Sequence, residues 1–114
     1  MKREIGDYLQ DVIDAMNKGM EFVKDIEYED FIRDDKTIFA VIRAIEIIGE
    51  AIKNIPADVR GEYPEIPWRE MAGMRDKLIH GYSGVKPVRI WETVKEEIPP
   101  LKPLFDKILN DLEK

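Results

Sequence analysis

Apolar side chains recur every three or four residues along almost the whole chain, and this spacing restricts the fold more than any other feature. Side chains three and four positions apart share one face of an α-helix, so each such run predicts a helix with one apolar face. The first run predicts a helix over about residues 3–26 and consists of Ile5, Leu9, Val12, Met16, Met20, Val23 and Ile26. Nothing alternates with a period of two over a useful length, so no sheet is expected. The pattern predicts an all-α fold, an antiparallel bundle of four to five helices with short connections.

Prolines and glycines divide the rest of the chain. Pro56 should end the second helix, and the proline-rich stretch that follows should be a connection with at most one short helical turn. Pro67 suits the first position of a third helix, where its missing N–H has no partner to lose, and Gly81 marks the end of that helix. Pro99 and Pro100 are expected to break the chain between two further helices. The predicted ranges are therefore about 28–55, 67–81, 88–98 and 101–112.

The chain is acidic overall but carries a local excess of basic residues. Its 114 residues suit a single domain spanning 1–114, and its net charge of −6 argues against broad, non-specific binding to nucleic acid. Between Trp68 and Trp91, however, five lysines and arginines accompany only two acidic residues. A small basic site on an acidic body suits a protein that contacts phosphate at one place.

The chain has no cysteine and no segment that resembles a targeting signal. The lack of cysteine removes disulfides, thiolate nucleophiles and thiolate metal sites together. A basic pair stands near the start, but no apolar run follows it, and no apolar stretch approaches the ~20 residues that span a bilayer. We therefore expect a cytoplasmic protein without a membrane segment.

His80 is the only histidine and thus the one side chain expected to exchange protons near neutral pH. On its position alone, near a helix end, it is more simply explained as a helix cap or as filling for an apolar gap. Its neighbours, however, favour a catalytic role for His80. Asp76, four residues earlier, shares its helix face and can hold one ring nitrogen, while Arg75 supplies a fixed cation and Tyr82 a phenol. This set suits phosphodiester chemistry, to which Lys77 adds attraction for the nucleic-acid backbone.

The segment RDKLIHGY, residues 75–82, resembles the Arg-x4-His-x-Tyr motif of the HEPN superfamily, and more narrowly the HepT-like toxins of HEPN/MNT (type VII) toxin–antitoxin pairs. The preceding MAGM, the helix text VIRAIEIIGEAIKNI and the later segment VRIWETVKEEIPPL also look like that family. Together these stretches cover about two-thirds of the chain. The motif and its context are specific when taken in order, whereas Arg-x4-His alone would not be.

The resemblance implies an endoribonuclease that needs no metal or other cofactor and acts as a homodimer, with Arg75 and His80 of both chains lining one cleft. It also implies an RNA substrate and a minimal nucleotidyltransferase antitoxin that silences the toxin by attaching AMP to Tyr82. Lys77 and Lys86 are then expected to contact RNA. Many family members have asparagine after the arginine, whereas this chain has Asp76, which adds a negative charge beside the phosphate site.

A second argument favours a dimer independently of the family. Cleavage by 2′-hydroxyl attack benefits from a general base and a general acid, yet one chain offers a single histidine. Two-fold symmetry would supply the second.

Other interpretations compete with a ribonuclease. The domain can instead be a binding module that engages a nucleotidyltransferase or nucleotide without cutting RNA, or a purely structural helical dimer. A carboxylate-bridged metal site at Glu46 and Glu50 is disfavoured because the expected Glu-x-x-His pairs are missing. The aromatic and thioether side chains near the motif are expected to serve packing first; they are Trp68, Trp91, Met71 and Met74.

Overall fold

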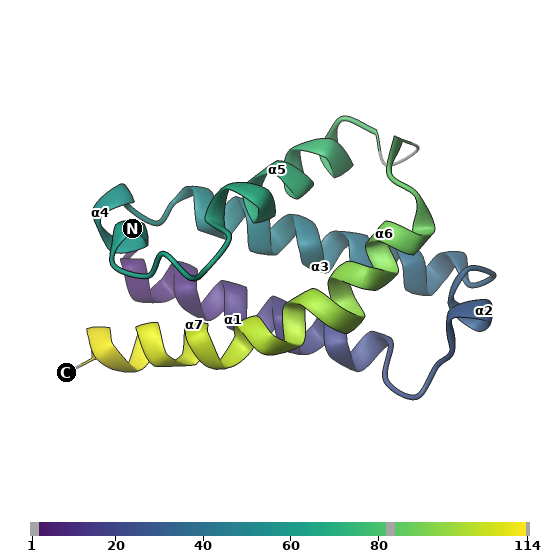
Figure 1. The fold of residues 1–114 in the computed structure, drawn as a ribbon, viewed down its shortest axis with the longest axis horizontal. Helices are drawn as coiled ribbons and strands as arrows, with labels where there is room; N and C mark the ends of the chain where they lie inside the picture. Colours follow the sequence, from purple (N-terminus) through teal and green to yellow (C-terminus); the bar gives the residue numbers. More distant parts are fainter. Residues whose placement is uncertain (1–2, 82–83, 114) are drawn as a thin grey trace.

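The computed structural model describes residues 3–81 and 84–113 and is helical, with no strand in that part of the chain (Figure 1). The elements are α1 (Ile5–Phe22), α2 (Tyr28–Phe31), α3 (Asp35–Lys53), α4 (Ala57–Gly61), α5 (Trp68–Ile79), α6 (Pro87–Glu92), η2 (Thr93–Glu97) and α7 (Ile98–Leu112). The predicted all-α fold is thereby confirmed. None of the described helices is both long and apolar enough to cross a membrane.

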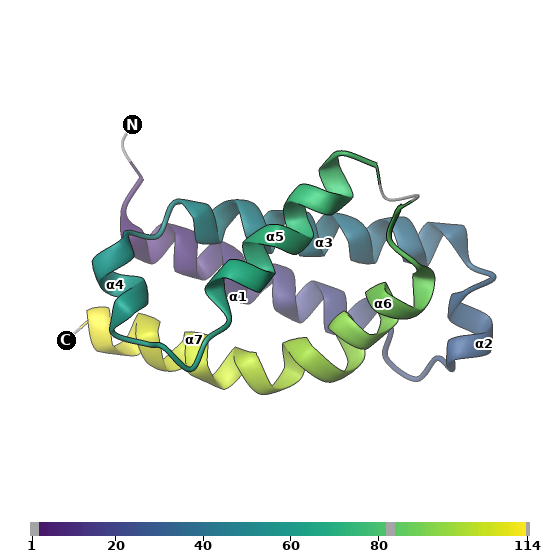
Figure 2. The ribbon, with the colours of Figure 1, turned by 45° about the horizontal axis from the view of Figure 1, so that its top comes forward.

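The core lies where α1 packs between α3 and α7, and α5 crosses α3 diagonally (Figures 1 and 2). The apolar stripe predicted for the first helix supplies Leu9, Val12 and Met16, all without solvent exposure. They meet the apolar face of α3 and the inner residues of α7, among them Phe105 and Ile108. Neighbouring long helices run antiparallel, as the short connections predicted.

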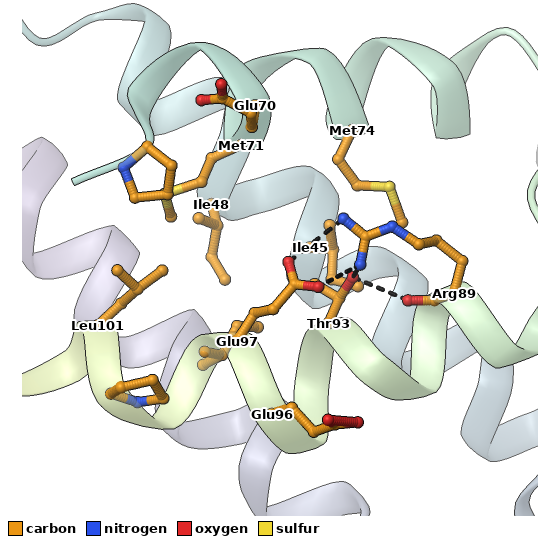
Figure 3. A pocket seen from close by; sticks show the side chains of 13 residues that line it. Ile45, Ile48, Glu70, Met71, Met74, Arg89, Thr93, Glu96, Glu97 and Leu101 are labelled. Atoms are coloured by element: carbon orange, nitrogen blue, oxygen red, sulfur yellow. Dashed lines mark hydrogen bonds and ion pairs between the residues drawn. The ribbon is translucent and has the colours of Figure 1, made fainter. Parts of the chain in front are cut away.

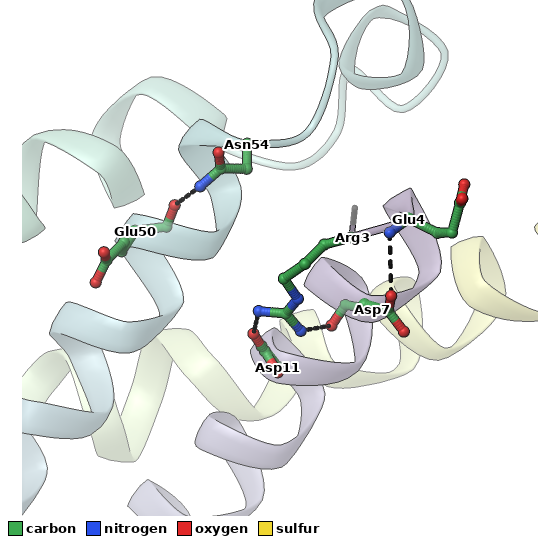
Figure 4. Close-up of polar contacts among 6 residues, drawn as sticks. All are labelled: Arg3, Glu4, Asp7, Asp11, Glu50 and Asn54. Carbon is green, nitrogen blue, oxygen red and sulfur yellow. Dashed lines mark hydrogen bonds and ion pairs between the residues drawn. The ribbon is translucent and has the colours of Figure 1, made fainter. Parts of the chain in front are cut away.

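The first helix is shorter than predicted at both ends. At its start, the Glu4 backbone N–H donates to the Asp7 carboxylate at 3.0 Å, and an ion pair of 2.7 Å joins Arg3 to Asp11 (Figure 4). Asp7 thus satisfies a donor left without an intrahelical partner. The helix ends at Phe22, and Asp25 shortly afterwards has a φ of 62°, in the left-handed region, so the helix does not reach residue 26.

The predicted continuous helix over residues 28–55 is wrong, because the chain forms two helices there. The short α2 ends at Phe31, and α3 starts anew at Asp35. Asp34 is the reason. Its carboxylate accepts the Thr37 backbone N–H at 3.1 Å and the Thr37 hydroxyl at 2.6 Å, a cap that starts a helix and is incompatible with continuing one through Asp34.

The predicted break at Pro99 and Pro100 is also wrong, since α6, η2 and α7 form one continuous helical run. Within a regular helix these prolines would remove N–H donors and collide with carbonyls one turn earlier. The wider π-type turn of η2 removes the conflict: the Ile98 N–H donates to the Thr93 carbonyl, five residues back, and the prolines fall in the first turn of α7.

The connection from residue 56 to 67 contains one short helix, α4, as predicted, and Pro67 directly precedes α5 rather than being its first residue. Both tryptophans serve packing, which confirms the simpler interpretation. The Trp68 ring lies 5.4 Å from the Phe105 ring, centroid to centroid, and its Nε1–H donates to a backbone carbonyl. Trp91 packs against the ring of Phe31 at 5.0 Å.

Candidate functional site

Close contact between α3 and α5 determines where Arg75 lies. Gly49 of α3 faces α5, and a Cβ added there would come 2.2 Å from the Arg75 Cβ, 2.9 Å from its Cγ and 3.1 Å from the Met71 carbonyl oxygen. These distances are shorter than carbon atoms in contact tolerate. Only glycine therefore lets the two helices approach this closely, and the stem of Arg75 rests on the surface that Gly49 leaves free.

The Arg75 guanidinium lies at the edge of this helix contact, with 23% of its side chain exposed. Its Nη1 donates to the Asp76 Oδ1 at 3.2 Å. Its Nε is buried and has no hydrogen-bond partner among the described residues. A buried donor without a partner is uncommon, and an acceptor from solvent does not reach this Nε while it stays buried.

The Asp76 carboxylate forms ion pairs with two basic side chains. Besides Arg75 it contacts the Lys53 ammonium, which comes from the end of α3. These hydrogen bonds, first that from Lys53 and then that from Arg75, lower the pKa of Asp76 below its usual value. The negative charge of Asp76, beside the expected phosphate site, is therefore largely offset by Lys53.

His80 lies at the exposed C-terminal end of α5, which excludes the interpretation that it fills an apolar gap. Its backbone N–H donates to the Asp76 carbonyl at 3.2 Å, and Gly81, with a φ of 132°, ends the helix. The expected contact between the Asp76 carboxylate and the imidazole is not formed among the described atoms, because Lys53 and Arg75 hold that carboxylate. An orienting role for Asp76 stays a prediction. Tyr82, the expected site of modification, lies outside the described residues.

The two lysines expected to contact RNA lie together, apart from Arg75. Lys77 and Lys86 are exposed and line one hollow between α5 and α6, together with Arg89. Two glutamates, Glu70 and Glu92, line the same hollow and reduce its positive charge. Because Lys77 follows Arg75 by two residues, or about 200° around the helix, the hollow opens on the other flank of α5.

Glu46 on α3 is mostly buried, with 18% of its side chain exposed, whereas Glu50 is exposed. An ion pair of 3.7 Å joins Glu46 to Arg43. Glu50 is exposed, and its backbone carbonyl accepts a hydrogen bond of 3.0 Å from the Asn54 side chain (Figure 4). Within the described ranges, no three histidine, aspartate or glutamate side chains gather into a group that could hold a metal ion.

Comparison with known families decides the relationship. The family described as "Ribonuclease HepT-like" matches residues 12–108. The chain belongs to this family. A protein of Thermococcus cleftensis named "Probable ribonuclease HepT" is 59% identical over 95% of this chain and 98% of its own length. A protein of Methanocaldococcus jannaschii, named as a candidate RNase, is 52% identical over 98% of this chain and 97% of its own length. No solved structure matches the chain at a significant level.

Two residues that support the site escaped the sequence analysis. Lys53 precedes Asp76 by 23 residues, and only the antiparallel contact of α3 with α5 brings the two together. Gly49 belongs to a stretch that resembles the HepT-like family, but its steric role depends on which helix faces it. The only signal in the sequence was a lone glycine within an apolar helix, a position where glycine usually lowers helix stability.

Proposed function

We propose that this protein is a metal-independent endoribonuclease whose site lies at the exposed C-terminal end of α5. Membership of the HepT-like ribonuclease family supports the reaction class. The observation that carries the proposal for the site is that Arg75, partly exposed, and His80, exposed at the helix end, lie on the same helix. Metal independence rests on the likeness of residues 75–82 to the HEPN motif.

In the proposed reaction, His80 transfers protons and Arg75 stabilises negative charge. One imidazole removes the proton of an RNA 2′-hydroxyl, whose oxygen attacks the adjacent phosphorus. The bond from phosphorus to the 5′-oxygen breaks, and that oxygen receives a proton from a second imidazole. The products are a 2′,3′-cyclic phosphate and a 5′-hydroxyl. Arg75 binds the phosphate and stabilises the charge that develops on its oxygens.

A homodimer would supply the second imidazole, because each chain contains one histidine. Arg75 and His80 of both chains would then line one cleft. Sedimentation of the purified protein tests this part of the proposal. A dimer at assay concentration is expected, whereas an active monomer would contradict it.

The proposed cellular role is that of the toxin in a HEPN/MNT toxin–antitoxin pair. A minimal nucleotidyltransferase would transfer AMP from ATP to the Tyr82 hydroxyl, releasing pyrophosphate and stopping cleavage. The test combines this protein with the nucleotidyltransferase encoded beside it, where one is present, and ATP. A mass gain of one AMP that Tyr82→Phe abolishes is expected, and an unchanged mass would contradict the role.

The activity itself is tested with two strands of the same sequence, one of RNA and one in which every sugar is 2′-deoxy. In the presence of EDTA, purified protein should cut a labelled RNA and leave 2′,3′-cyclic phosphate ends, while the all-2′-deoxy strand stays intact. Cleavage of the deoxy strand, or no cleavage of any RNA until a divalent ion is added, would contradict the proposal.

A second function is favoured by one observation, the engagement of Arg75 by Asp76. If that ion pair withholds Arg75 from phosphate, the domain would be a binding module that engages a nucleotidyltransferase or nucleotide. Such a module would bind its partner and leave RNA whole.

A further inference from the structure

A cavity of about 450 Å³ lies between α5 and the helical run from α6 to α7, with α3 as its floor (Figure 3). Its walls are mostly apolar. Met71 and Met74 extend into it from α5, Met74 toward Arg89, and Ile48 and Leu101 line the other sides. The volume falls within the range of pockets that enclose small organic ligands. The unbranched methionine side chains can also adapt to the shape of an occupant.

The rim of this cavity is acidic. Arg89 donates to both Glu97 carboxylate oxygens and, at 3.1 Å, to the Thr93 hydroxyl, so its charge is already neutralised within the rim (Figure 3). Glu70 on α5 and Glu96 on η2 stand at opposite edges, and neither forms an ion pair among the described residues. Two rim carboxylates thus lack an ion-pair partner among the described residues, and Glu70 also borders the hollow that Lys77 and Lys86 line.

The wall that carries Thr93, Glu96 and Glu97 is the π-type turn η2. Such turns are rare, and they occur frequently at functional sites. This turn displaces the helix backbone where the cavity opens. The same turn accommodates Pro99 and Pro100, and it places Thr93, Glu96 and Glu97 on the cavity wall.

We propose that this cavity binds a small apolar molecule that carries one positive charge. The apolar body would lie among Met71, Met74 and Leu101, removed from water. The cationic group would stay at the rim beside Glu70 or Glu96, where it remains partly hydrated and is attracted by the carboxylate at that edge. An anion of the same shape would meet those carboxylates and bind less well.

The proposal is independent of the proposed ribonuclease reaction. Met74 directs its side chain into the cavity, whereas the next residue, Arg75, faces Gly49 on α3. Cleavage of RNA can therefore fail while the cavity binds its ligand, and the reverse also holds.

Two dansyl probes of opposite charge provide the test. Dansylcadaverine joins the aromatic group to an ammonium, and dansylglycine joins it to a carboxylate. Wild-type protein should bind dansylcadaverine saturably, at one site per chain, and dansylglycine much more weakly, as measured by fluorescence. Equal affinity for both probes, or no saturable binding of dansylcadaverine, would overturn the proposal.

A pair of double variants separates the rim from general surface charge. Glu70→Gln with Glu96→Gln should weaken dansylcadaverine binding by up to about five-fold, the range for one solvent-exposed charge interaction. The matched control, Glu62→Gln with Glu113→Gln, removes the same charge from exposed positions outside the cavity and should leave binding unchanged. An equal loss in the control would contradict a specific site.

The NMR signals of the methionine methyl groups locate the probe in the wild-type protein, without any substitution. Titration with dansylcadaverine should shift the Met71 and Met74 signals and leave that of Met16, buried in the core, in place. Unmoved Met71 and Met74 signals would overturn the proposal. So would a shift of these two signals on simple dilution, because a second copy of the chain would then cover the cavity.

Discussion

Gly49→Ala should separate the two helices that position Arg75. An added Cβ would lie 2.2 Å from the Arg75 Cβ, whereas ordinary contact begins at 3.4 Å, so α5 must move by on the order of 1 Å. Overpacking of this kind costs about 1–3 kcal/mol, and the better helix propensity of alanine returns about 1 kcal/mol. We expect a net loss of up to about 2 kcal/mol in the free energy of unfolding.

The effect on RNA cleavage should exceed the effect on stability. A displacement of about 1 Å in a group that binds the reacting phosphate can lower the rate on the order of a hundred-fold. The assays are urea unfolding, and the single-turnover cleavage rate at a temperature where the variant is fully folded. Both are measured on the same preparation, so that a fall in rate is not confused with unfolding.

Gly61→Ala is the matched control, because it adds the same methyl group to α4, outside the hollow that Lys77 and Lys86 line, at a place where nothing lies within 4 Å. It should leave cleavage unchanged and stabilise the protein by about 0.5–1 kcal/mol. The steric explanation fails if Gly49→Ala matches wild type in both assays, or if the two alanine variants lose activity equally.

Three further predictions concern charge, capping and packing. Asp76→Asn should strengthen RNA binding, because it frees Arg75 and Lys53, and weaker binding in a filter assay would oppose this. The lowered pKa of Asp76 means that its stabilising effect is present above its usual value of 3.8 and is lost as pH falls further, so the difference in Tm between wild type and Asp76→Asn should shrink below about pH 4. Asp34→Ala removes the cap of α3 and should lower Tm at pH 7. Because the hydrogen bonds from Thr37 also lower the pKa of Asp34, that difference should shrink in acid, and a constant difference would refute it. Phe105→Ala should cost about 3–5 kcal/mol in urea unfolding, because its ring is fully buried, and a cost under 1 kcal/mol would be inconsistent with this core.

The spacing of the apolar residues predicted the all-α fold. The two wrong predictions of where helices break have different origins. The apolar repeat identified the long helices because each had to bury one face. The break before α3 was readable in principle, since Asp34 and Thr37 stand at the separation of a helix cap. The sequence could not predict that the helix continues through Pro99. Two adjacent prolines predict a break, and nothing near them in the sequence shows that a π-type turn shifts the helix register before they begin.

The site was only partly predictable, for a related reason. Spacing within one helix placed Arg75, Asp76 and His80 near the end of α5, and the structure agrees. Same-face spacing also suggested that Asp76 holds His80, but it omits competitors from other helices, and Lys53 on α3 takes that carboxylate. Contacts across helices depend on packing that no single segment encodes.

The most direct test of the central claim is the rate at which purified protein cuts RNA in EDTA when either proposed catalytic side chain is removed. Wild type and the surface control Lys107→Ala should cut at the same rate, because Lys107 is exposed on α7, away from α5. Arg75→Ala and His80→Ala should each lose at least about a hundred-fold, the usual contribution of a proton-transfer or charge-stabilising group. Full activity in His80→Ala would contradict the assignment of this helix end as the ribonuclease site.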